Sequence, residues 1–255
     1  MTAPPTAAPP TALIGGFGFQ RVPGLEITRA ERIATPFGDP SDALQFGILA
    51  GREWVLLRRH GAGHRIPPHR VNYRANLWAL RQAGVARIVA CAAVGGIDRA
   101  LPVGGLVVPE QLIDATWGRA HTFFDGAPGE LDALGDLQHI DFSRPYCEAL
   151  RADLLAAARR AGVAVAPAGV YAVTQGPRLE TAAEIDALER GGASIVGMTG
   201  MPEAALAREL GLAYATLAIV VNPAAGRAPA RIDMAGIAAH LKAGAAKALA
   251  VLAQL

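Results

Sequence analysis

Apolar runs and segments of helical period alternate along the chain. Short runs rich in Val, Ile, Leu and Ala predict buried strands, and longer stretches with an apolar residue every three or four positions predict helices. The predicted extended segments are residues 12–16, 44–50, 54–58, 87–93, 106–109, 163–174, 194–198 and 213–222. The predicted helices are residues 71–83, 145–162, 180–190 and 202–210, followed by one at the C-terminus. This alternation predicts an α/β fold, a single domain with a central mixed β-sheet flanked by helices.

Residue types mark the course of two of these helices. Pro202 stands at the first position of helix 202–210, Glu203 lies in its first turn and Gly211 follows its end, as the start and stop rules require. The C-terminal helix carries a row of apolar residues on one face, namely Ile237, Leu241, Ala245, Leu249 and Leu252. That row predicts an amphipathic helix.

The N-terminal residues differ in composition from the rest of the chain. Residues 1–12 are rich in Pro, Ala and Thr and predict a disordered lead-in to a domain spanning residues 13–255. They lack the pattern of a secretory signal, and no uninterrupted apolar run reaches the ~20 residues of a membrane span. Cys91 and Cys147 have neither metal-ligand nor redox spacing and fit free thiols in a reducing compartment. We therefore expect a cytoplasmic protein with no membrane partner.

Charge and missing motifs argue against several classes of function. The chain has 24 Lys and Arg against 22 Asp and Glu, and this net charge of +2 is small for a general nucleic-acid binder. No phosphate loop, dinucleotide fingerprint or nucleophile elbow is present. His60, His64 and His69 cluster on a loop interrupted by prolines, with no acidic residue among them. Zinc binding there is an alternative that we rank below anion binding.

A basic segment begins where the predicted strand 54–58 ends. Residues 58–74 contain arginines and histidines but no acidic residue. Such a segment could be an ordinary solvated surface. However, Arg58 and Arg59 directly follow apolar strand residues, and α/β proteins usually bind ligands at strand ends. An arginine and a histidine there can hold a phosphate dianion through charge-assisted hydrogen bonds.

Three polar residues at other strand ends are further candidates. Thr199 leads into a helix N-terminus, whose free N–H groups favour anions, although a plain helix-start role would also explain it. Asn222 ends strand 213–222 and can donate and accept hydrogen bonds, although it also suits a turn. Glu180 follows segment 163–174 and could be only a first-turn helix acid. Each of these signals is weak alone.

Together the signals match one family. From Leu13 to about Leu252 the chain resembles the trimeric purine nucleoside phosphorylases and methylthioadenosine phosphorylases, and it looks most like the branch that acts on 5′-methylthio-nucleosides. The resemblance is carried by residues 14–16 (IGG), 35–43 (TPFGDPSDA), 59–64 (RHGAGH), 71–76 (VNYRAN), 92–97 (AAVGGI), 176–181 (GPRLET) and 197–203 (GMTGMPE). Their order and spacing are far more specific than any single motif.

The resemblance implies a role for each matched residue. The implied phosphate-binding set is Arg59, His60, Thr199 and the backbone N–H of Ala93, with His64 nearby. Met198 would lie under the ribose, Asn222 would face N7 and O6 of the purine, and Glu180 would face its N1–H edge. The implied catalytic residues are Asn222, Glu180 and His60. Phosphate would attack while the sugar becomes oxocarbenium-like and the purine gains negative charge, so a donor is needed on the base side.

The resemblance also bears on cofactors and partners. Inorganic phosphate is the implied co-substrate, and no metal or organic cofactor is implied. A homotrimer is implied, in which Phe123 or Phe124 reaches a neighbouring subunit's site. Residues 119–139 form a long polar and aromatic connection, a candidate lid or partner-contacting loop.

Three positions predict the preferred nucleoside. Relatives that act on adenine nucleosides carry an Asp where this chain has Asn222, whereas an amide can donate to O6 or N7 of a 6-oxopurine. Adenine has no N1–H for Glu180, and an unpaired buried group costs ~1–3 kcal/mol. Met234 stands where relatives specific for ordinary nucleosides carry a His for the 5′-hydroxyl, and a thioether suits a methylthio group. These features favour 5′-methylthioinosine, with methylthioadenosine phosphorylase or general purine nucleoside phosphorylase activity as the alternative.

Three positions depart from the family pattern. Phe17 stands where the family usually has a Ser or Thr that binds phosphate, and Ala92 lacks a hydroxyl that some relatives carry. Leu179 replaces an aromatic residue that stacks on the base in many relatives. Phe17 favours a different class of function, a catalytically impaired nucleoside-binding protein, and water could also partly replace phosphate as the nucleophile.

Overall fold

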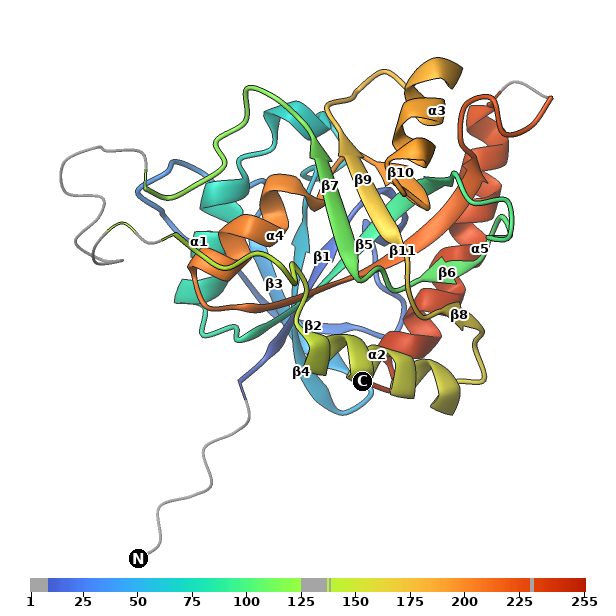
Figure 1. Ribbon diagram of the computed structural model, residues 1–255. Coiled ribbons are helices and arrows are strands. Elements are labelled where there is room, and N and C mark those ends of the chain that lie inside the picture. The colour runs from blue at the N-terminus through green and yellow to red at the C-terminus, as the bar shows by residue number, and fades with distance from the viewer. Residues whose placement is uncertain (1–8, 125–136, 138, 230–231) are drawn as a thin grey trace, which may run out of the picture.

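The computed structural model describes residues 9–124, 137, 139–229 and 232–255, and one large sheet runs through them (Figure 1). Its strands are β1 (Thr11–Gly15), β2 (Glu26–Glu31), β3 (Leu44–Leu49), β4 (Arg52–Arg58), β5 (Arg87–Gly96), β6 (Leu106–Val107), β7 (Gln111–Ala115), β8 (Val165–Ala166), β9 (Val170–Thr174), β10 (Ile195–Gly197) and β11 (Ala213–Pro223). The helices are α1 (Tyr73–Gln82), α2 (Glu148–Arg160), α3 (Ala182–Arg190), α4 (Gly200–Glu209) and α5 (Met234–Leu252), with the 3-10 helices η1 (Phe17–Phe19) and η2 (Pro68–Arg70).

β5 is the central strand of this sheet. The strand order is β2-β3-β4-β1-β5-β10-β9-β7, and β11 pairs with the other edge of β5 and continues to β6 and β8. β5 runs parallel to β1 and β11, but its last residues, Gly95 and Gly96, pair antiparallel with β10. Two groups of strands with opposite directions therefore meet at the end of β5. The predicted α/β fold with a mixed sheet flanked by helices is confirmed.

Helices cover both faces of the sheet, with α1 and α4 on one face and α2 and α5 on the other (Figure 1). Successive residues of an inner strand point to opposite faces. In β1, Ala12 and Ile14 belong to the core beneath α1 and α4, whereas Leu13 belongs to the core beneath α2 and α5. Because both faces are buried, the inner strands are apolar at nearly every position.

Three strand assignments differ from the prediction. β1 begins at Thr11, before the expected start of order, because this residue pairs with Trp54 on one side and Arg87 on the other. β2 and β7 were not predicted. Every residue of β2 is exposed, so its sequence has no apolar alternation to mark it.

α5 is the one helix among the described residues that is long and apolar enough to cross a membrane, by length and composition alone. It has 19 residues and a mean hydropathy of 1.3. Leu241, Gly244 and Ala248 on its inner face are buried, and Gly244 lets the helix approach Ile219 of β11 closely. These contacts are those of a core helix on a sheet, and this helix also contributes to the pocket described below.

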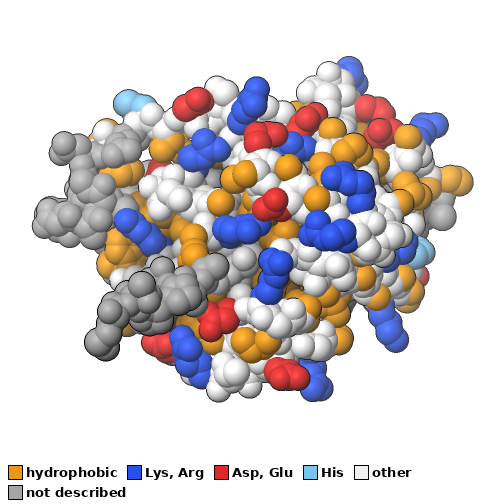
Figure 2. All heavy atoms as spheres, turned by 90° about the horizontal axis from the view of Figure 1, so that it is seen from below, with side chains coloured by type: hydrophobic (Ala, Val, Ile, Leu, Met, Phe, Trp, Pro, Cys, Tyr) orange, Lys and Arg blue, Asp and Glu red, His pale blue; other side chains and the backbone are white. Residues whose placement is uncertain are grey.

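The surface carries both charges. Figure 2 shows Lys and Arg side chains interspersed with Asp and Glu and with hydrophobic side chains over the face seen there. This mixture agrees with the small net charge of +2.

Candidate functional site

A pocket of about 490 Å³ lies at the carboxyl ends of β4, β9, β10 and β11, beside the second half of β5. Its volume is in the usual range for a small-molecule site. The candidate residues that line it are Arg59, His60, His64, Ala92, Ala93, Leu179, Glu180, Met198, Thr199, Asn222 and Met234. The structure therefore brings together side chains that are widely separated in the sequence. Only Phe17 among the candidates is not placed, because its side chain lies outside the described part of the chain.

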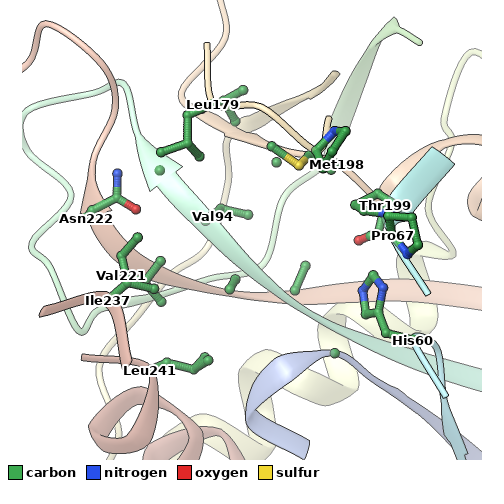
Figure 3. Close-up of a pocket in the computed structure, with 18 of the residues that line it drawn as sticks. His60, Pro67, Val94, Leu179, Met198, Thr199, Val221, Asn222, Ile237 and Leu241 are labelled. Carbon is green, nitrogen blue, oxygen red and sulfur yellow. The ribbon is translucent and has the colours of Figure 1, made fainter. Parts of the chain in front are cut away.

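The pocket has two polar ends (Figure 3). His60 and Thr199 lie close together at one end, next to Pro67. Asn222 and Leu179 lie at the opposite end. Met198 lies between the two ends. This arrangement separates a basic, hydroxyl-bearing end from an end that carries the Asn222 amide. Glu180, which follows Leu179 in the chain, also lines the pocket.

Arg59 is the most buried charge of the basic end, with a side chain 1 % exposed. Its Nε donates to Oε2 of Glu203 at 2.7 Å and its Nη2 donates to Oε1 at 2.8 Å. Nη1 donates to the carbonyl oxygen of Cys91 at 3.1 Å. Burial alone would lower the pKa of Arg59, but the adjacent Glu203 carboxylate outweighs it and the pKa lies above its usual value. Arg59 is thus a fixed, fully charged donor.

His60 is a neutral histidine with a defined tautomer. Its Nδ1 lies 2.8 Å from the carbonyl oxygen of Ile66, which can only accept, so Nδ1 carries the proton and Nε2 has a lone pair. Burial lowers the pKa of His60 to about 3, and the nearby charge of Arg59 adds to this effect. The ring of His64 lies 4.3 Å from that of His60, between centroids, and burial also lowers the pKa of His64.

Thr199 precedes α4 without capping it. Met201 has an extended backbone, with φ −120° and ψ 139°, so the regular helix starts at Pro202, as predicted. The Thr199 side chain makes no capping hydrogen bond, and a plain helix-start role therefore does not explain it. Thr199 and the backbone of Ala92 and Ala93 on β5 line the same pocket as Arg59.

Glu180 and Asn222, the two candidates for binding the base, each form a hydrogen bond within the chain. Thr174 Oγ1 donates to Oε1 of Glu180 at 2.6 Å and so orients the carboxylate. Asn222 Nδ2 donates to the carbonyl oxygen of Pro223 at 2.6 Å. A half-turn of this amide would exchange the donor and acceptor that it presents to a ligand. Glu180 thus offers a hydrogen-bond acceptor to the edge of a base. Asn222 offers either a donor or an acceptor, depending on the orientation of its amide.

One wall of the pocket is apolar and comes from α5. Met234, at the first position of the helix, is 67 % exposed although it lines the pocket, and Leu179 is 43 % exposed. Ile237 and Leu241 continue the wall (Figure 3). From the sequence these two residues are recognisable only as part of the apolar face of the helix, and not as residues of the site.

Three expectations about residues 119–139 have different outcomes. Phe123 is fully buried in this chain's own core, where its ring lies 5.1 Å from that of Phe37 between centroids. The expectation of a contact with a neighbouring site is therefore wrong for Phe123 and stays a prediction for Phe124. Arg119 is held inside the fold by several hydrogen bonds, so the lid does not begin there. Residues 125–136 and 138 lie outside the described part of the chain.

The basic segment after β4 was a candidate for binding an anion or, as the alternative, zinc. Arg58 pairs with Asp42 at 2.7 Å and does not line the pocket, whereas Arg65 does. Within the described ranges, no group of three or more His, Cys, Asp or Glu is arranged to hold a metal ion. Glu203 and Arg119 were not identified from the sequence as site residues, because only the fold shows which side chains they contact.

Comparisons with known proteins give one family. The model of the phosphorylase superfamily matches residues 10–255. A Pseudomonas syringae pv. tomato protein named "probable S-methyl-5′-thioinosine phosphorylase" is 56 % identical over 96 % of this chain and 97 % of its own. The 6-oxopurine nucleoside phosphorylase of Pyrococcus furiosus is 46 % identical over 86 % of this chain and 81 % of its own. The structure of Schistosoma mansoni methylthioadenosine phosphorylase with adenine superposes with a TM-score of 0.91 and 33 % identity, covering 97 % of this chain and 90 % of that one.

Proposed function

Because the chain belongs to the phosphorylase superfamily, we propose that its pocket cleaves the N-glycosidic bond of a purine nucleoside with inorganic phosphate. The observation that carries this proposal is the division of one pocket into two polar ends with Met198 between them. Arg59, His60 and Thr199 form an end suited to an anion, and Glu180 and Asn222 form an end suited to a base. The products would be the free base and a ribose 1-phosphate.

This phosphorolysis transfers the sugar from the purine to phosphate, and it needs no oxidant or reductant. A phosphate oxygen forms a bond to C1′ while the bond between C1′ and N9 breaks, and the bonding pair moves to the purine. The proton that hydrogen phosphate loses in forming the ester balances the one that the departing purine takes up. Arg59 and the N–H groups near Ala93 hold the phosphate beneath the sugar. An amide N–H of Asn222 then donates to N7 and stabilises the negative charge that develops on the leaving base. Mutagenesis of such preorganised donors in other enzymes typically costs ~3–4 kcal/mol of transition-state stabilisation.

The two ends and the apolar wall favour one kind of nucleoside. Thr174 holds Glu180 as a carboxylate acceptor, which suits the N1–H of a 6-oxopurine and not the bare N1 of adenine. Met234, Ile237 and Leu241 offer an apolar wall with no hydroxyl or imidazole, which suits a methylthio group better than a 5′-hydroxyl. We therefore propose 5′-methylthioinosine as the preferred substrate. The relatives named as thioinosine and 6-oxopurine nucleoside phosphorylases support this choice.

The test is a nucleoside panel measured with and without phosphate. The panel contains 5′-methylthioinosine, 5′-methylthioadenosine, inosine and adenosine, and both the free base and the sugar 1-phosphate are quantified. We expect phosphate-dependent release of base with the highest kcat/KM for 5′-methylthioinosine. Base release that does not depend on phosphate would make the protein a hydrolase, and base binding without turnover would make it a nucleoside-binding protein.

We also propose that the protein is a homotrimer. Large apolar side chains remain exposed at and near the pocket, with Met234 at 67 %, Trp117 at 71 % and Leu179 at 43 % exposure. A neighbouring copy could cover them, which the trimeric family resemblance implies. Light scattering in solution should then give about three times the chain mass of 26.4 kDa. The mass of a single chain would contradict the proposal.

We place the enzyme in the cytoplasm. Cys91 and Cys147 are free thiols, which fits a reducing compartment. Fractionation of cells should recover the activity with cytoplasmic markers, and recovery with the membrane or secreted fraction would contradict this assignment.

A further inference from the structure

Arg119 does not line the pocket, yet it is bonded to the segments that form it. It follows β7, and its side chain reaches the loop after β9 and the loop between β10 and α4. The guanidinium donates to four backbone carbonyl oxygens: Met198 (2.9 Å), Met201 (2.5 Å), Thr174 (3.2 Å) and Gln175 (2.9 Å). Its Nε donates to Oε1 of Gln175 at 3.1 Å. The Tyr73 hydroxyl of α1 lies 3.3 Å from Nη1 and shares the two N–H groups of this nitrogen with the carbonyl oxygens of Met198 and Met201.

These acceptors lie on the segments that carry the two ends of the pocket, and of the four residues only Met198 itself lines it. Met198 and Met201 flank Thr199, so their carbonyls fix the loop that carries the hydroxyl of the phosphate end. Thr174 orients Glu180 and Gln175 begins the turn that leads to it, so their carbonyls fix the base end. One side chain therefore links the two halves of the site across the sheet.

Arginine has the properties needed for this contact. Its planar guanidinium offers five N–H donors in a fixed fork, and it stays charged in the protein. Carbonyl oxygens only accept, and hydrogen bonds from a charged donor are stronger than those between neutral groups. A lysine at the same position could not reach carbonyls in this fork geometry.

We infer that Arg119 is a positioning residue that sets the distance between the phosphate end and the base end of the pocket. This inference rests on the proposed phosphorolysis, because that reaction needs phosphate and base held on opposite sides of one sugar. A displacement of about 1 Å in either loop can lower the rate about 100-fold in enzymes that depend on such alignment.

Arg151 provides a matched control. It also donates to backbone carbonyl oxygens, with distances of 2.9 Å to Pro109 and 2.8 Å to Pro167, and its side chain is only 9 % exposed. Arg151 lies on α2 and does not line the pocket. We therefore expect the loss of the hydrogen bonds from Arg151 to these carbonyl oxygens to affect the stability of the fold without moving the two ends of the site.

The experiment compares Arg119→Lys with Arg151→Lys at a temperature where both remain folded. We expect Arg119→Lys to raise the KM values for nucleoside and phosphate and to lower kcat/KM by about 10- to 100-fold. We expect Arg151→Lys to lower the melting temperature while kcat and both KM values stay close to those of the wild type. In Arg119→Ala, added guanidinium ion at low, non-denaturing concentration should restore part of the lost activity.

Several outcomes would overturn the inference. One is an unchanged kcat/KM in folded Arg119→Lys, and another is an equal kinetic effect in Arg151→Lys. Recovery of both Arg119 variants only as unfolded protein would also overturn it, because Arg119 would then hold the fold and not the site. If the wild type itself lacks phosphorolysis, the proposed function fails separately. Calorimetric binding of hypoxanthine to wild type and Arg119→Lys then still tests the positioning role, which equal affinities would refute.

Discussion

At the scale of single residues, the buried guanidinium of the anion end is already paired before phosphate binds. Arg59 is paired with Glu203 through two hydrogen bonds, and His60 is neutral. We therefore expect phosphate to be attracted by Arg65, which also lines the pocket, and by N–H and O–H donors, and less by the charge of Arg59, which Glu203 balances. Phosphate bound here would favour the protonated form of His60, because an opposite charge nearby stabilises the charged form.

The neutral state of His60 predicts how stability depends on pH. The unfolded chain binds a proton near pH 6.5, whereas the folded protein resists it until the pKa of about 3. Between these values the unfolded state holds more protons, so stability is fully present above about pH 6.5 and falls as the pH drops toward 3, by up to about 1.4 kcal/mol per pH unit. Melting temperatures from pH 8 to pH 4 should show this loss, and His60→Gln should show a smaller one.

The control for this prediction is a histidine outside the pocket. His121→Gln removes a half-buried histidine beside Asp114, and its pH profile should keep the acid loss of the wild type. A His60→Gln profile parallel to that of the wild type would show that the acid sensitivity arises elsewhere.

We expect Asn222 to govern which base the site prefers. An aspartate at this position can share a proton with N7 and accept from a 6-amino group, whereas it repels the O6 of a 6-oxopurine. We expect Asn222→Asp to shift the ratio of kcat/KM values from 5′-methylthioinosine toward 5′-methylthioadenosine by about tenfold or more, since each mismatched polar contact costs ~1–3 kcal/mol. Steady-state kinetics with both nucleosides measures this ratio. Asn222→Ala should lower both activities, and an unchanged ratio in Asn222→Asp would refute the role.

The residues of the site were predictable from the sequence, but their charge partners were not. Arg59, Thr199, Glu180 and Asn222 each follow or end a predicted strand, and the sheet brings strand ends together at the pocket. Glu203 could be interpreted from the sequence only as an acid in the first turn of a helix. Its actual partner, Arg59, lies 144 positions earlier and becomes a neighbour only when α4 packs on the sheet against β9 and β11.

At the scale of secondary-structure elements, the turn after β9 fits closely against the loop after β10. Gly176 has a backbone φ of +61°, a left-handed conformation that favours glycine. A Cβ at this position would collide with Sδ of Met198. The close approach of the two loops therefore requires glycine, and it holds Met198 between the two ends of the pocket.

The contact predicts the effect of Gly176→Ala. The added methyl should displace Met198 and raise the KM for the nucleoside about tenfold or more, because small displacements near the reacting centre are costly. The left-handed conformation should also cost ~1–2 kcal/mol of stability. Gly211→Ala is the control, since Gly211 has a similar φ of +68° and no described atom within 4 Å of its added Cβ. It should lose similar stability with an unchanged KM, and equal KM effects in both variants would contradict the prediction.

Strands and helices were predictable from the sequence where their burial produces a pattern of apolar residues. β1, β4, β5 and β11 were predicted because both faces of each are covered and their residues are apolar. β2 is fully exposed and lies at the sheet edge, so hydrogen bonding to β3 defines it without any apolar period. In α5 the deeply buried positions include Gly244 and Ala248, which sequence reasoning passed over because small residues carry little apolar signal.

At the scale of the whole molecule, one buried ion pair joins the sheet, a covering helix and the pocket. Arg59 follows β4, Glu203 lies on α4, and the hydroxyl of Tyr214 on β11 donates to Glu203 Oε1 at 2.8 Å. The Arg59 and Glu203 side chains are 1 % and 0 % exposed. Burial raises the pKa of Tyr214 well above its usual value, and the Glu203 carboxylate adds to this, so the phenol remains a donor. Fold stability and the anion site therefore share these three side chains.

Because these side chains serve both the fold and the anion site, phosphate binding should affect the melting temperature of variants in which the ion pair is broken. Glu203→Gln leaves the buried guanidinium of Arg59 without its counter-charge, and breaking a buried pair in this way costs ~3–5 kcal/mol of unfolding free energy. A bound anion can replace part of the missing charge, so added phosphate should raise the melting temperature of Glu203→Gln more than that of the wild type. Glu189→Gln removes one of the two carboxylates that pair with Arg227. Because the Glu189 side chain is 51 % exposed and Asp186 still pairs with Arg227, this control should change both quantities much less. Equal phosphate-dependent shifts in Glu203→Gln and wild type would mean that Arg59 does not contact the anion, and the assignment of the phosphate end would have to move away from this pair.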